Sequence, residues 1–132
     1  MMKEKDAQVL FGKWIRENKY DKTAAFELKL CHNNNALSFN AFQPQQTPCL
    51  LEAKRNFLFK KLSDADPTLK PFDCFTIAHC EAWVIAIWKH EGKRPVAYWL
   101  EIEDFIEAQK LSTRKSITEF IASKIASKII NL

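Results

Sequence analysis

Residues 23–30 read Thr-Ala-Ala-Phe-Glu-Leu-Lys-Leu, a short apolar run that carries one acid and one base two positions apart. Successive side chains of a β-strand point to opposite faces, so this spacing places Glu27 and Lys29 on one face. The other face is apolar and is formed by Phe26, Leu28 and Leu30. Charged groups in an apolar run are expensive to bury unless they are paired, hydrogen-bonded or bound to metal. The stretch therefore predicts either a half-exposed edge strand with a salt bridge or one part of a functional site.

The composition favours one compact domain over residues 1–132. The hydrophobic fraction is 47%, and the chain has only two glycines and five prolines, unlike disordered or fibrous proteins. A chain of 132 residues is long enough to bury a core of its own. Twenty Lys and Arg residues against sixteen Asp and Glu residues give a net charge of +4, which favours a polyanionic partner without requiring one.

The sequence predicts neither a membrane segment nor a disulfide framework. No uninterrupted apolar segment approaches the roughly 20 residues that cross a bilayer, and the charged start at Met1–Asp6 is unlike a secretory signal. We therefore expect a cytoplasmic protein that has no membrane partner. The cysteines have no C-x-x-C spacing, which favours reduced thiols packed as small apolar groups; they are Cys31, Cys49, Cys74 and Cys80. The alternative is a metal cluster of these cysteines with His32 and His79, although the spacing matches no structural zinc pattern.

The rest of the chain alternates between helical and extended patterns. Helical periodicity predicts helices over 6–18, from about 45 to 55, and over 103–110, and alternation predicts strands over 37–42, 57–62 and 96–102. Two β-rich runs, 71–78 and 82–88, are predicted to form a β-hairpin. The capping-box pattern Ser116-Ile117-Thr118-Glu119 predicts an amphipathic C-terminal helix that runs to Leu132. The expected fold class is α/β, with a central mixed β-sheet flanked by α-helices.

One order of features raises the significance of the opening stretch. The E-x-K strand is followed by a polar turn, by Ser38-Phe39 in an extended segment, and by Gln46 at the start of a helix. This order resembles the PD-(D/E)xK nuclease superfamily, and within it the Holliday-junction resolvases, over roughly residues 24–62. The Glu-Leu-Lys and Pro-Phe-Asp-Cys-Phe segments, at 27–29 and 71–75, are similar to a phage-type variant in which the aspartate follows the E-x-K strand.

The resemblance implies a restriction-endonuclease-like core and a metal-dependent DNA endonuclease. Glu27 and Asp73 would be ligands of Mg²⁺ or Mn²⁺, with the Leu28 carbonyl as a third, and no organic cofactor is expected. Lys29 would orient the attacking water and offset phosphate charge, and Gln46 would hydrogen-bond a water or the scissile phosphate. Asp73 is predicted because few residues precede Glu27 and most of them are helical, and because an acid inside an apolar strand needs a partner. The protein is expected in the host-cell cytoplasm if its source is viral.

The predicted partners are DNA and a second copy of the chain. Phosphate contacts are predicted at Arg114, Lys115, Lys124 and Lys128, along a basic ridge of the tail helix, whose apolar face would supply a homodimer interface. Two alternatives stay open: a catalytically silent nucleic-acid-binding module, and a protein-interaction adaptor. Each candidate residue also has an ordinary interpretation, namely a capping acid for Asp73, a helix-start polar group for Gln46, and a solvated helix face for the four basic residues.

Overall fold

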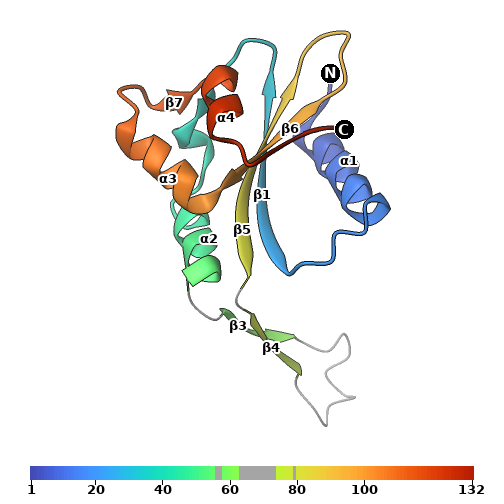
Figure 1. The fold of residues 1–132 in the computed structure, drawn as a ribbon, viewed down its shortest axis with the longest axis vertical. Helices are drawn as coiled ribbons and strands as arrows, with labels where there is room; N and C mark the ends of the chain where they lie inside the picture. The colour runs from blue at the N-terminus through green and yellow to red at the C-terminus, as the bar shows by residue number, and fades with distance from the viewer. Residues whose placement is uncertain (56–57, 63–73, 79) are drawn as a thin grey trace.

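The computed structural model describes residues 1–55, 58–62, 74–78 and 80–132, and places the side chains of 1–55 and 80–132. Figure 1 shows the helices and strands of this chain. The helices are α1 (Glu4–Glu17), the 3₁₀ turn η1 (Phe39–Ala41), α2 (Gln46–Arg55), α3 (Ile102–Leu111) and α4 (Glu119–Ile125). The strands are β1 (Ala24–His32), β2 (Leu37–Ser38), β3 (Leu58–Leu62), β4 (Cys74–Ala78), β5 (Glu81–Lys89), β6 (Val96–Glu101), β7 (Ser116–Ile117) and β8 (Lys128–Asn131).

The central element is a four-stranded mixed sheet with the order β1-β5-β6-β8. β1 and β5 are parallel, whereas β5–β6 and β6–β8 are antiparallel. β5 lies in the interior of the sheet and is buried at seven consecutive positions, Ala82–Trp88, as its continuous apolar run predicts. The α/β fold with a central mixed sheet flanked by helices is thus confirmed.

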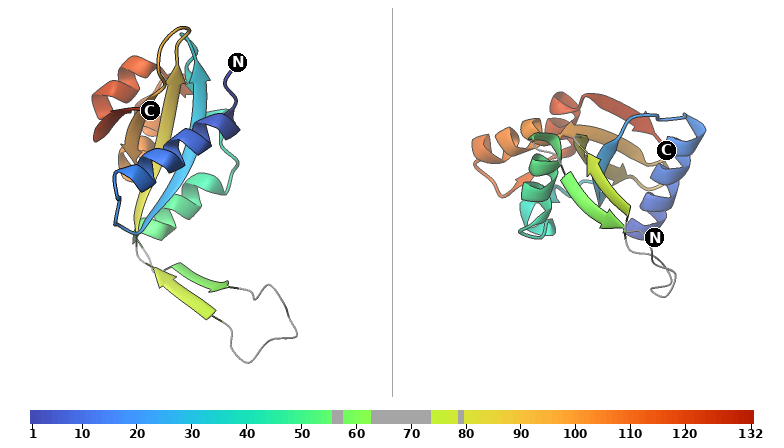
Figure 2. Two further views of the ribbon diagram at one scale, coloured as in Figure 1. Left: turned by 90° about the vertical axis from the view of Figure 1, so that its right-hand side faces the viewer. Right: turned by 90° about the horizontal axis from the view of Figure 1, so that it is seen from below.

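Helices cover both faces of the sheet (Figure 2). On one face, Ala7 and Phe11 of α1 pack against an aromatic cluster that includes Trp83 and Trp99. On the other face, α2, α3 and α4 contribute Leu50, Phe105 and Ala122 to a second cluster. No helix in the described residues is long and apolar enough to cross a membrane.

The two faces of β1 are those that its sequence predicts. Phe26, Leu28 and Leu30 pack on the α1 side of the sheet, where the Phe11 and Phe26 rings lie 5.1 Å apart. The side chains of Glu27 and Lys29 therefore lie on the α2 side, as the alternation of a strand requires.

The predicted β-hairpin of residues 71–88 is wrong. β4 pairs with β3 in a separate two-stranded sheet, and β5 pairs with β1 and β6. Both runs have the composition of strands, but composition does not specify the partner of a strand. A strand buried on both faces gains most between two neighbours, and β1 and β6 provide them.

The predicted C-terminal helix is correct only in part. α4 ends at Ile125, and the chain then forms β8, which pairs with β6. The Ser127 N–H donates to the Trp99 carbonyl at 2.9 Å, so pairing begins directly after the helix. The cap is Thr118, whose Oγ1 accepts the Ile121 N–H at 3.3 Å, and not Ser116, which lies in β7. Pairing of the β-branched pair Ile129-Ile130 with β6 outweighs the helical spacing of the tail.

β1 forms one edge of the sheet, and its hydrogen-bonding direction follows from its two ends. The Thr23 carbonyl accepts the Glu81 N–H at 3.1 Å, and the Asn33 N–H donates to the Lys89 carbonyl at 3.0 Å. The odd-numbered residues of β1 therefore direct their backbone groups toward β5, and the even-numbered residues direct theirs away from the sheet. In the described part of the chain no strand pairs with this outer edge.

Amide hydrogen exchange along β1 is expected to alternate. The amides of Ala25, Glu27 and Lys29, which donate toward β5, should exchange at least about tenfold more slowly than those of Phe26 and Leu28. The exchange rates can be measured residue by residue by nuclear magnetic resonance. Equal protection of both sets would contradict an open edge and would mean that another strand pairs there.

Candidate active site

The residues of the E-x-K pattern meet Gln46 on the α2 side of β1. The Lys29 Nζ lies 3.2 Å from the Glu27 Oε1, and the Gln46 Nε2 donates to the same oxygen at 2.9 Å. Three of the four residues predicted to be catalytic are thus in direct contact, although Gln46 belongs to a different element. The other carboxylate oxygen, Oε2, has no hydrogen-bond partner within the described residues.

The orientation of the Gln46 amide is determined from both ends. Its Oε1 accepts the Gln43 N–H at 2.8 Å, so its Nε2 is the group that faces Glu27. Gln46 is the first residue of α2, and free backbone N–H groups and polar side chains are usual in the first turn of a helix. The helix-start interpretation of Gln46 and its interpretation as a site residue are therefore compatible.

Lys29 is the only charged residue that is buried among the placed side chains, with 8% of its surface exposed. Its ammonium has three donors, and its contacts there are the Glu27 carboxylate and the Phe42 ring, whose centroid lies 5.0 Å from Nζ. A buried cation needs compensation, which one carboxylate and one aromatic face provide here. The sequence pattern did not identify Phe42, because no local spacing links it to Lys29.

A shallow cavity of about 270 Å³ adjoins Glu27 and Gln46. Its remaining lining comes mainly from α2, with Cys49, Leu50 and Ala53. The Glu27 side chain is 25% exposed, whereas that of Lys29 is 10% exposed. A ligand that approaches from this side therefore meets the carboxylate first and the ammonium behind it.

The Leu28 carbonyl is directed to the outer edge of β1, away from β5, because Leu28 is an even-numbered residue of the strand. Within the described residues no hydrogen bond reaches it. This oxygen therefore makes no hydrogen bond to β5, and a carbonyl that binds a metal ion has to meet that condition.

The described residues fit a divalent cation only in part. They contain no cluster of three or more His, Cys, Asp or Glu side chains able to hold a metal ion. The partners of Ala25 and Glu27 on β5 are Ala82 and Val84, so β5 brings no second acid to Glu27. Asp73 lies outside the described residues, and β4, the strand that follows it, pairs with β3 and not with β1. The ligand role of Asp73 stays a prediction.

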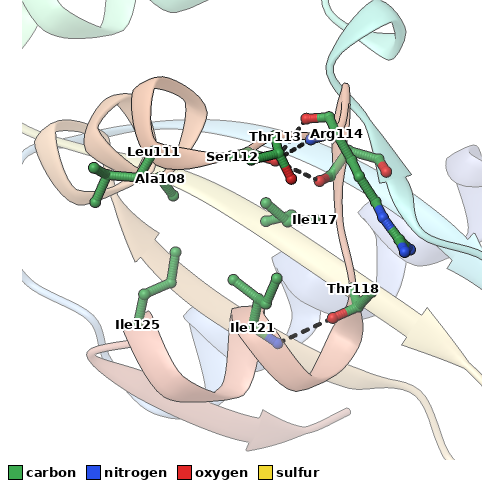
Figure 3. A pocket seen from close by; sticks show the side chains of 10 residues that line it. Ala108, Leu111, Ser112, Thr113, Arg114, Ile117, Thr118, Ile121 and Ile125 are labelled. Carbon is green, nitrogen blue, oxygen red and sulfur yellow. Dashed lines mark hydrogen bonds between the residues drawn. The ribbon is translucent and has the colours of Figure 1, made fainter.

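The four basic residues predicted to contact DNA do not form one ridge. Lys128 lies on β8, and its Nζ packs over the Trp99 ring at 4.9 Å and the Tyr20 ring at 5.2 Å, on the α1 side of the sheet. Lys124 lies on α4 and packs over Phe120. Arg114 borders a separate cavity beyond the end of α3, as Figure 3 shows. The prediction that Lys124 and Lys128 share one helix face is wrong, because α4 ends at Ile125 and Lys128 lies on β8. DNA contact by each of the four residues stays a prediction.

A polar cluster that the sequence did not indicate lies at the start of α4. Glu119 accepts from the Tyr98 hydroxyl at 2.7 Å and contacts the His90 Nε2 at 2.6 Å. Burial and the adjacent carboxylate raise the pKa of Tyr98 above its usual value. These contacts attach α4 to β6 and to the turn after β5, so we assign them a structural role.

The three cysteines whose side chains are placed are free thiols, as expected. Cys31 and Cys80 are buried, and Cys49 is exposed. Burial raises the pKa of Cys31 to about 11, which makes its thiolate scarce at neutral pH and argues against a nucleophilic role. The alternative metal cluster includes His79, which lies outside the described residues.

The site therefore combines a carboxylate, a buried ammonium and an oriented amide at a strand edge that also presents a backbone carbonyl. Comparisons of the chain with protein-family models, with curated proteins and with solved structures found no match. The similarity to the PD-(D/E)xK superfamily thus rests on the motif residues alone.

Proposed function

We propose that the protein is a metal-dependent endonuclease that hydrolyses phosphodiester bonds in duplex or branched DNA. The observation that supports the proposal is the contact of Glu27, Lys29 and Gln46 around one carboxylate oxygen. The resemblance required these residues to converge from two elements. An ordinary edge-strand salt bridge requires no glutamine from a helix, and it would leave the lysine more exposed than 8%.

Each residue has a role that its position supports. The Lys29 ammonium, held behind the carboxylate, would stabilise the negative charge that develops on the phosphate oxygens and would help to position the attacking water. The Gln46 amide holds the Oε1 of Glu27, and Oε2 would be the oxygen that binds the ion. The Leu28 carbonyl adds a second hard oxygen at the same edge.

Magnesium or manganese would supply Lewis-acid stabilisation and lower the pKa of a bound water. Glu27 and the Leu28 carbonyl are the described groups that would hold the ion. At least one further acid is needed, and Asp73 is the acid that the sequence predicts. Symmetrical cutting of two strands would also call for a homodimer.

Replacing Lys29 with methionine is expected to lower the rate of DNA cleavage by about 100-fold. Methionine has a similar length and no charge. The Glu27 carboxylate that loses its partner is 25% exposed and keeps its bond from Gln46, so the charge left behind is not fully buried and the fold should persist. Cutting of supercoiled plasmid and of a synthetic four-way junction, with Mg²⁺ or Mn²⁺, measures the effect on gels.

The matched control is Lys13→Met, which removes a lysine of an exposed pair with Glu17. This variant should cut at the wild-type rate. Wild-type cutting by Lys29→Met would contradict the proposed site.

A catalytically silent nucleic-acid-binding module is the second candidate. The observation that favours it is that the described residues bring only one carboxylate to the site. Calorimetric titration with Mn²⁺ separates the two functions, because only the nuclease needs the ion. Absence of Mn²⁺ binding, together with salt-dependent DNA binding, would favour the silent module.

A further inference from the structure

A second feature of the surface, unrelated to Glu27, is a groove between α3 and α4, which we call the α3–α4 groove. It encloses about 420 Å³. Leu111 lies on its α3 wall, Ile121 and Ile125 lie on its α4 wall, and Ile117 lies between them (Figure 3). Cavities of this size and apolar lining are typical of binding sites.

Exposed apolar side chains gather at this groove. Leu111 is 74% exposed and Ile121 is 39% exposed, and both line the groove. Phe120, which is 69% exposed, adjoins Ile121 on α4. Leu111 and Ile121 are two of the six large exposed apolar residues among the placed side chains, and exposed apolar surface beside a recess is a feature of interaction sites.

Basic residues outnumber acids in the segment that forms the groove. Arg114 lines the groove, and Lys110, Lys115 and Lys124 belong to the same segment; we call these four residues the basic rim. The acids of this segment are Glu107, one turn before Leu111 on α3, and Glu119, whose two oxygens are bound by His90 and Tyr98. An occupant of the groove therefore meets apolar walls and surroundings in which basic groups predominate.

We propose that the α3–α4 groove binds an acidic amphipathic helix of a partner protein. Apolar side chains from one face of that helix would insert between Leu111 and Ile121, and its carboxylates would meet the basic rim. A second copy of this chain is disfavoured because it would place two positive rims together. DNA would match the charges but would leave Leu111, Phe120 and Ile121 without apolar contacts, and a flat membrane surface would not fill a recess.

The proposal is independent of the nuclease function and is tested with a peptide probe. A fluorescein-labelled peptide of about 18 residues, long enough to be partly helical, carries leucines on one face and glutamates elsewhere. Fluorescence anisotropy with the full chain should show saturable binding. A peptide of the same composition, with its leucines distributed around the helix, should bind at least about tenfold more weakly.

The decisive variant is Ile121→Glu, which places a charge on the groove wall at an exposed position. It should weaken peptide binding at least about tenfold. Val9→Glu is the matched control, because Val9 is 62% exposed on α1, on the other face of the sheet, and its change should leave binding unaltered. Unchanged thermal melting of both variants confirms that the fold is retained.

Three results would overturn the proposal. They are equal affinity for the two peptides, equal loss in the two variants, and no saturable binding at all. Arg114→Glu provides a further measurement, because it should weaken peptide binding. If this variant lowers the affinity for DNA and leaves the affinity for the peptide unchanged, Arg114 binds nucleic acid and not the peptide, and the proposal is wrong.

Discussion

Replacing Glu27 with glutamine is expected to lower metal-dependent DNA cleavage by at least about 1,000-fold, the largest catalytic effect that we predict for a single substitution. The change removes the only carboxylate of the described residues at the site, while the new amide oxygen can still accept from Gln46 and Lys29. The fold should therefore persist, and the loss should appear in metal affinity as well as in cleavage. Calorimetric titration with Mn²⁺ and gel assays on junction DNA measure the two effects separately.

Glu17→Gln is the matched control for this experiment. Glu17 forms an exposed pair with Lys13 at 3.8 Å, and such surface pairs contribute little to stability. This variant should bind Mn²⁺ and cut DNA as the wild type does. If Glu27→Gln retained both wild-type metal affinity and wild-type cleavage, Glu27 would be only the partner of a buried lysine.

The largest effect on stability is expected for Trp99→Ala, which should reduce the free energy of unfolding by about 3–5 kcal/mol. Trp99 is fully buried on β6, and its ring centre lies 5.4–5.6 Å from five aromatic rings, those of Phe11, Trp14, Tyr20, Phe26 and Trp83. Its Nε1 has no hydrogen-bond partner among the described residues. Removing an unpaired polar group along with the ring offsets a small part of the loss in stability. Denaturation in urea measures the change.

Phe120→Ala is the comparison for this prediction, because Phe120 is also aromatic but is 69% exposed. Its free energy of unfolding should change by less than about 0.5 kcal/mol. A small effect at Trp99 would mean that the aromatic cluster collapses around the deleted ring, since the cost of a cavity depends on how far its walls relax.

Local patterns predicted the elements that their own residues determine. The alternation of Phe26, Leu28 and Leu30 with Glu27 and Lys29 places the two sets on opposite faces of β1, as the structure confirms. The helix that begins at Gln46 was also predictable, because prolines and polar residues precede an apolar periodic segment. These features depend on the period of a strand or a helix, which a sequence displays directly.

Features that depend on distant partners could not be predicted in this way. Adjacent β-rich runs favoured a hairpin, but β5 pairs in parallel with β1, and the hydrogen bonds that decide this are not encoded by local composition. The helical spacing of Ile125 and Ile129 was misleading because the last segment gains more from pairing with β6. The contact of Lys29 with Phe42 is of the same kind, since it arises from packing and not from spacing.

The parallel pairing of β1 with β5 has a consequence for folding. β5 and β6 are joined by an antiparallel pairing between neighbouring segments, whereas β1 reaches β5 only after the long connection through α2, β3 and β4 has closed. Contacts that close long loops incur their entropic cost before they gain any pairing, so they tend to form late. We therefore expect β1 to join a preformed β5–β6 pair, so that Glu27 and Lys29 are brought to Gln46 in the final steps of folding.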